Sequence, residues 1–178
     1  MNKTELKLKE IRDTFPEMFK IVKELEDEFG EIKNIEHLYY PHFYNKYDED
    51  YPTSQLVFEY EKGHRLVLFS GLYYRVSGLT TKCYLIKPED KDKLFDSDNI
   101  CYPDRDMELS IEDYITIEQV DVLEDILWSD KNDFDWLCER LNYMDGKIHI
   151  EADVNLNKLS EKDRKVIEAA LDVLGIRY

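Results

Sequence analysis

The sequence predicts an α+β fold, chiefly because the spacing of its apolar residues changes twice along the chain. This spacing is helical over the first 30 residues, has a period of two from Ile32 to Lys87, and is helical again after residue 110. We expect an N-terminal helix or helix pair, a four-stranded mainly antiparallel sheet, an acidic helical region, one further strand and a C-terminal helix. With 178 residues, of which 43% are hydrophobic, the chain is expected to form a single domain over residues 1–178.

The N-terminal segment predicts helix, with Thr4 as its expected N-cap and Gly30 as its end. Pro16 either kinks one helix or separates two. We favour a break at Thr14 and Phe15, because proline is tolerated in the first turn of a helix. The stripe expected to pack on a core consists of Phe15, Met18, Phe19, Val22, Leu25 and Phe29.

Four strands are expected in a meander, with tight turns at Lys62-Gly63 and Ser77-Gly78. The predicted strands are Ile32–Tyr40, Gln55–Glu61, Arg65–Val76, which Gly71 can interrupt, and Thr80–Lys87. The third strand carries the run Leu66–Phe69, which is apolar at every position. It should therefore be central, or be covered on its second face by the acidic region.

The remainder of the chain predicts a loop followed by helices and one more strand. Residues 88–106 have no sustained period, so they form either a long loop or a loop with a short helix at Glu89–Phe95. Ser110 and Thr116 each begin a sequence that resembles a capping box. The later expected elements are helix 117–128, helix Phe134–Met144, strand Lys147–Val154 and helix Glu161–Leu174, capped by Ser160 and closed by Gly175.

The negative charge is concentrated in one part of the chain. The formal net charge is −16, and residues 89–135 alone contribute −13, with 17 acidic and 4 basic residues. Direct nucleic-acid binding is disfavoured, because phosphate recognition needs clustered Lys and Arg. The acidic sub-region 89–135 instead favours a basic partner, such as a nuclease, a nucleic-acid-binding complex or a toxin. The alternative is a solvated surface that only keeps the protein soluble.

The predicted helix 117–128 could present carboxylates as a substitute for phosphates. Glu118, Asp121 and Asp125, with Glu124 beside them, fall on roughly one helix face and are about one turn apart. A nucleic-acid strand has comparable charge spacing. Small acidic inhibitors of phage or mobile-element origin and toxin-neutralising immunity proteins have this general composition, an analogy that rests on composition alone.

Tyrosines form a second concentration, around Pro41 and Pro52. At this density some of them should be exposed, where tyrosine is suited to partner binding. The alternative is an edge strand whose tyrosines pack on the sheet. The candidate partner-binding residues are Asp104, Asp106, Glu108, Glu112, Asp113, Glu118, Asp121, Glu124, Asp125, Tyr44 and Tyr47.

No catalytic residue, metal ligand or cofactor is assigned from the sequence. There is no GxSxG nucleophile elbow, and the six glycines are dispersed rather than gathered in a phosphate-binding loop. A calcium loop starting at Asp104 fails, because Leu109 and Ile115 occupy positions that need Gly and Glu. The main alternative function is a metal-dependent hydrolase with carboxylates around Asp104–Asp113 and a contribution from His64 or His149. A scaffold subunit or a homo-oligomer is the third hypothesis.

A cytoplasmic protein that does not enter the membrane is expected. The longest nearly uncharged apolar run, Leu66–Tyr74, is much shorter than the ~20 residues needed to span a bilayer. Cys83, Cys101 and Cys138 are odd in number and widely spaced, which favours a reducing compartment.

Overall fold

The computed structural model describes residues 1–90, 96, 98–146 and 160–173. The chain divides into two compact units, residues 1–141 and 142–178, and each is described by itself. The fold is α+β, with helices and a five-stranded antiparallel sheet. One domain over residues 1–178 stays a prediction.

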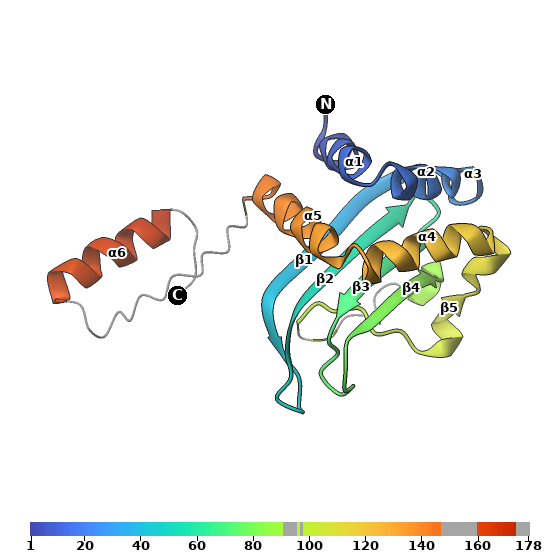
Figure 1. Cartoon of the computed structure of the whole chain (residues 1–178). Coiled ribbons are helices and arrows are strands. Elements are labelled where there is room, and N and C mark those ends of the chain that lie inside the picture. Colours follow the sequence, from blue (N-terminus) through green and yellow to red (C-terminus); the bar gives the residue numbers. More distant parts are fainter. Residues whose placement is uncertain (91–95, 97, 147–159, 174–178) are drawn as a thin grey trace. The chain divides into compact units, whose positions relative to one another are not determined.

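Three helices open the chain: α1 Lys3–Thr14, α2 Pro16–Glu24 and α3 Glu26–Phe29 (Figure 1). The break predicted before Pro16 is confirmed. The cap of α1 is Asn2 rather than Thr4, because Asn2 and Glu5 form a reciprocal capping box. The Thr4 hydroxyl instead donates to the carbonyl of Lys33, at 3.3 Å.

The five strands follow one another in the sheet in chain order, and each neighbouring pair is antiparallel. They are β1 Ile32–Tyr44, β2 Asp50–Tyr60, β3 Arg65–Gly71, β4 Thr80–Ile86 and β5 Glu108–Leu109. The predicted meander is confirmed, and the acidic region adds β5. The first hairpin is longer than predicted, because β1 continues past Pro41 after a register shift between Tyr40 and Phe43.

One face of the sheet packs against α4 Ile117–Trp128 and α5 Lys131–Met144, which follow one another along it (Figure 1). Alternate strand residues such as Leu56, Phe58 and Leu68 are fully buried. The Ser70 hydroxyl donates to the carbonyl of Leu127 at 2.7 Å, which ties β3 to the end of α4.

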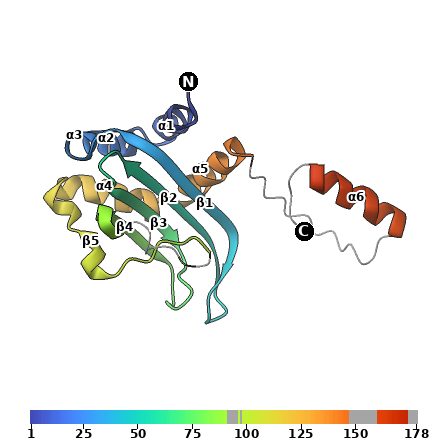
Figure 2. The same cartoon turned by 180° about the vertical axis from the view of Figure 1, so that it is seen from behind.

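Residues 98–107, which precede β5, lie on the opposite face of the sheet (Figure 2). Val67 and Phe69 pack there in one buried cluster with Ile100 and Cys101. Gln55 fixes this segment with its side-chain amide, which donates to the carbonyl of Asn99 at 3.1 Å and accepts from the amide of Cys101 at 2.8 Å. Strand β3 is therefore both central in the sheet and covered on its second face, which confirms the prediction for the third strand.

The connections around β5 contain short 3₁₀ turns: η1 Pro88–Asp90, η2 Arg105–Met107 and η3 Ile111–Asp113. The alternative prediction is a short helix at Glu89–Phe95. Its first two residues lie in the turn η1, and residues 91–95 lie outside the described residues. Ser110 forms no capping box, since its hydroxyl donates to the side chain of Glu112 at 2.9 Å and no side chain caps η3.

In the second unit, α6 spans Glu161–Val173, and the hydroxyl of Ser160 accepts from the amide of Asp163 at 3.1 Å. This is the predicted cap. The predicted strand Lys147–Val154 and the predicted helix end at Leu174 and Gly175 lie outside the described residues. Within the described parts of the chain, no helix combines the length and the apolar character needed to cross a membrane.

Gly71 is predicted to be essential for the close approach of β3 to β2. A Cβ atom there would lie 2.6 Å from the Cα of Thr53, a backbone atom that cannot move away cheaply. Gly71→Ala should destabilise the protein by about 1–3 kcal/mol, measured by urea unfolding. Thr80→Ala, at the paired position on β4, is the control and should stay within about 0.5 kcal/mol. Equal stability of the two variants would contradict the prediction.

Candidate functional site

Helix α4 displays the strongest candidate surface, and its local sequence explains its position. Thr116 and Gln119 form the predicted capping box at its start. Leu123, Ile126 and Leu127 are buried against the rest of the unit. The residues one half-turn away must therefore point to solvent.

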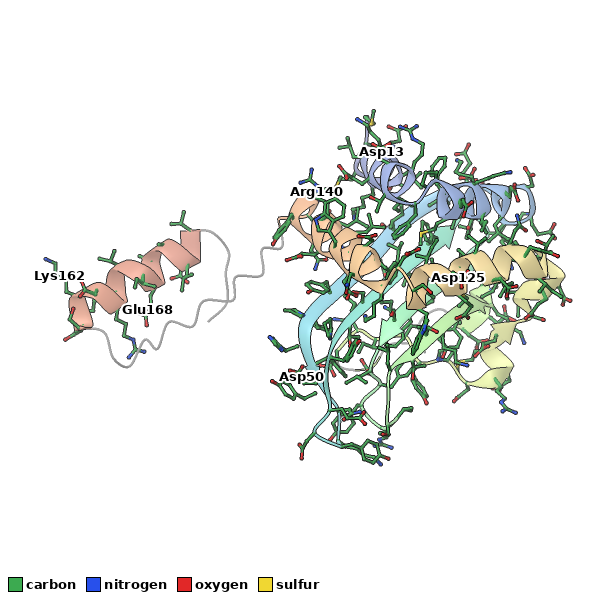
Figure 3. All side chains as sticks on the ribbon, in the orientation of Figure 1. Asp13, Asp50, Asp125, Arg140, Lys162 and Glu168 are labelled. Atoms are coloured by element: carbon green, nitrogen blue, oxygen red, sulfur yellow. The ribbon has the colours of Figure 1, made fainter. Side chains whose placement is uncertain are left out.

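The exposed side of α4 carries a row of carboxylates that ends in a tryptophan. Glu118, Asp121 and Asp125 are exposed, and Trp128, three positions further on, is 61% exposed. Figure 3 labels Asp125 on this helix. Within the described part of the chain, no Lys or Arg forms an ion pair with these three carboxylates. The negative charge of the row is therefore available to a partner.

The neighbouring helix α5 adds a second exposed tryptophan. Phe134, Leu137 and Leu141 are buried, whereas Trp136 is 52% exposed. The chain has two tryptophans, and both lie on the solvent side of the two helices that cover the sheet. Tryptophan is enriched at binding hot spots, so each exposed tryptophan is a candidate partner contact.

We call the set Glu118, Asp121, Asp125, Trp128 and Trp136 the helical face. The carboxylates of the helical face are among the residues predicted from the sequence, whereas its tryptophans are not. The signal was available, because Trp128 continues the spacing of Glu118, Asp121 and Asp125 on the same helix side.

Glu124 does not share the exposure of this row. It is half-buried and accepts a hydrogen bond from the hydroxyl of Thr81 on β4, at 3.1 Å. Burial raises the pKa of Glu124 above its ordinary value, while the hydrogen bond from Thr81 and the charge of Lys82 partly oppose this shift.

Glu108 and Glu112 join Glu124 around a pocket of about 440 Å³ beside β4. The lining also includes Lys82 and Arg105. Burial raises the pKa of Glu108, and the two cations partly oppose this shift. The pKa of exposed Glu112 is lowered by hydrogen bonds from its own backbone amide and from Ser110. The structure thus brings these three predicted residues together.

Asp104, Asp106 and Asp113 are exposed in or next to the 3₁₀ turns η2 and η3. Among the described residues, no group of three or more His, Cys, Asp or Glu side chains is arranged to hold a metal ion. His64 stacks on Phe29, with ring centroids 4.1 Å apart, and burial lowers its pKa. His149 lies outside the described residues.

The two predicted tyrosines, Tyr44 and Tyr47, are both exposed at the end of the β1–β2 hairpin. Tyr44 faces Asp50 across the strand pair, and the negative charge of Asp50 raises its pKa. Lys46 lies over the ring of Tyr47, 5.0 Å from its centroid. A partner cation would therefore compete with Lys46 for that ring.

Glu49 holds this hairpin against the loop before β4. Its carboxylate accepts from the amide of Gly78 at 2.8 Å, from the hydroxyl of Ser77 at 2.7 Å and from the side chain of Asn45 at 2.7 Å. These hydrogen bonds lower the pKa of Glu49. The tyrosines are thus carried on an anchored hairpin.

The three cysteines are free, and none has the environment of a nucleophile. Burial raises the pKa of Cys83 and of Cys138, and raises that of Cys101 to about 12. At neutral pH these thiols are protonated; Cys101 and Cys138 are small buried side chains, and Cys83 is half-buried.

No known protein family, curated protein or solved structure matches this chain.

Proposed function

We propose that the chain is a non-enzymatic binding protein that docks its helical face on a basic surface of another protein and thereby blocks that surface. The observation that carries the proposal is the exposed carboxylate row of α4 ending in Trp128, together with the exposed Trp136 on the next helix, α5. The carboxylates would steer the encounter and pair with Lys or Arg, while the tryptophans would supply the buried apolar contact.

The candidate partners are a nuclease, a nucleic-acid-binding complex or a basic toxin, since each presents clustered Lys and Arg. In such a complex the chain would act as a nucleic-acid mimic or an immunity-type inhibitor. Free cysteines suit a reducing compartment, and we propose that the interaction takes place in the cytoplasm.

Reversing charge on α4 tests the proposal. The double variant Asp121→Lys with Asp125→Lys should lose at least about tenfold in affinity for a basic protein captured from native cell lysate, with a flatter salt dependence. Affinity is measured by titration at low and high salt after nuclease treatment. Glu118 is left unchanged because a lysine in the first turn of α4 would also oppose the helix dipole.

The matched control carries the same change in net charge away from α4. Asp13→Lys on α1 and Glu31→Lys in the turn before β1 replace exposed carboxylates. The affinity of this control should stay within about threefold of wild type, and any loss it shows measures the general effect of net charge. Equal losses in the two double variants would show that net charge, rather than the helical face, governs capture.

A further inference from the structure

Strand β4 is paired on both sides over only part of its length. All seven of its residues pair with β3, whereas only Leu85 and Ile86 pair with β5. Leu85 and Ile86 are 1% and 0% exposed, while Thr80 to Cys83 are half-buried or exposed. The first part of β4 is therefore an open sheet edge.

The ladder shows which backbone groups this edge presents. The amide of Lys87 donates to the carbonyl of Met107 at 3.1 Å, so the backbone groups of Lys87 point away from β3. The β3–β4 register runs without a bulge, so the groups of every second residue point the same way. Thr81 and Cys83 thus direct N–H and C=O away from β3, and no backbone group among the described residues pairs with them there.

The other edge of the sheet is protected in ways that β4 is not. Lys7 on α1 donates to the carbonyl of Ile35 at 3.2 Å, and Thr4 donates to that of Lys33. Pro41 and the adjacent register shift interrupt β1 further along. These features discourage pairing at β1, whereas the stretch Thr80–Cys83 contains two β-branched residues and no proline.

The pocket described above lies directly beside the open edge, since residues 82–84 of β4 line it. Three carboxylates, Glu108, Glu112 and Glu124, face two cations, Lys82 and Arg105. A cationic side chain entering here would balance the excess carboxylate. The net charge of −16 disfavours a second copy of this chain as the occupant and favours a basic one.

We infer that an extended basic segment of the partner adds to the sheet alongside Thr80–Tyr84, with a Lys or Arg side chain in the pocket lined by Glu108, Glu112 and Glu124. The inference rests on the proposed function, that the chain binds a basic protein. Main-chain hydrogen bonds to Thr81 and Cys83 would supply affinity, and the pocket would select the charge.

The test uses a short synthetic peptide of alternating valine and lysine, with blocked ends, titrated into the full chain. The amide signals of Thr81 and Cys83 should shift, and their hydrogen exchange should slow by at least about tenfold in the complex. Thr81→Pro, which removes the outward N–H but no bond to β3, should weaken peptide binding by at least about tenfold. Thr81→Val loses the same hydroxyl but keeps the N–H, and should bind within about threefold of wild type.

Several results would overturn strand addition: no peptide binding at millimolar concentration, equal binding by Thr81→Pro, or unchanged exchange of both amides. The exchange measurement on the wild-type chain decides the question even if Thr81→Pro does not fold. A dimer formed through this edge, seen by sedimentation, would assign the edge to a second copy instead. If the peptide fails while Asp121→Lys with Asp125→Lys still loses the lysate partner, strand addition is wrong and the proposed function stands.

Discussion

Asp135→Leu is expected to destabilise the protein by about 3–5 kcal/mol, because it leaves the charge of Lys131 buried without a counter-charge. Lys131 and Asp135 are 6% and 7% exposed, and their charged groups are 2.9 Å apart on consecutive turns of α5. Lys131 also donates to the carbonyl of Ser70, and the Ser54 hydroxyl donates to Asp135 at 2.6 Å. The pair thus joins α5 to β2 and β3.

Replacing both charges at once should cost much less than either single change. Burial lowers the pKa of Lys131 even though Asp135 opposes the shift, so the ion pair does not fully offset the desolvation of the ammonium. The double variant Lys131→Met with Asp135→Leu removes that desolvation penalty. Its remaining cost is the loss of the hydrogen bonds that the Ser54 hydroxyl and the Ser70 carbonyl make with the pair.

Urea unfolding followed by circular dichroism measures the four corners of this double-mutant cycle. A coupling free energy of about 3 kcal/mol is expected between Lys131 and Asp135. Asp133→Leu is the control, because it removes an exposed carboxylate from the first turn of the same helix and should cost about 1 kcal/mol or less. Additive single and double changes would show that the two charges are not coupled.

Elements that follow from local spacing could be predicted, and those that depend on distant contacts could not. The helix 117–128, its cap at Thr116 and the meander follow from apolar periods and turn residues. The strand β5 is two residues long and forms only because Glu108 and Leu109 meet β4. No periodicity in the sequence distinguishes such a short segment from a loop.

The candidate site could be predicted in part for the same reason. The outward row of α4 is a property of one helix, so its spacing identifies Glu118, Asp121 and Asp125. Glu124 belongs to the same helix, but its burial depends on Thr81 of β4. The burial of Asp135 likewise depends on Ser54, 81 positions away in the sequence. A carboxylate in a charged segment is ordinarily exposed, so the sequence alone gives no sign of either contact.

Trp128→Ala and Trp136→Ala are each expected to reduce affinity for the basic partner by about 30-fold, which corresponds to about 2 kcal/mol. A large aromatic side chain contributes most to the binding free energy where the partner removes it from water. Carboxylates such as Asp125 favour partners with a basic surface. Stability should change by no more than about 0.5 kcal/mol, because both residues are already more than half exposed in the free chain.

The affinity of each tryptophan variant is measured by titration calorimetry with the captured partner. Tyr74→Ala removes an exposed aromatic side chain that lies outside α4 and α5, and it should leave binding within about threefold of wild type. Trp136→Phe leaves Trp128 as a single fluorescent reporter, whose emission should shift to shorter wavelength when the partner excludes water from it. If Trp128 lies at the centre of the interface, partner binding must shift its emission and its removal must lower the affinity. Unchanged emission together with full affinity of Trp128→Ala would therefore place the partner elsewhere.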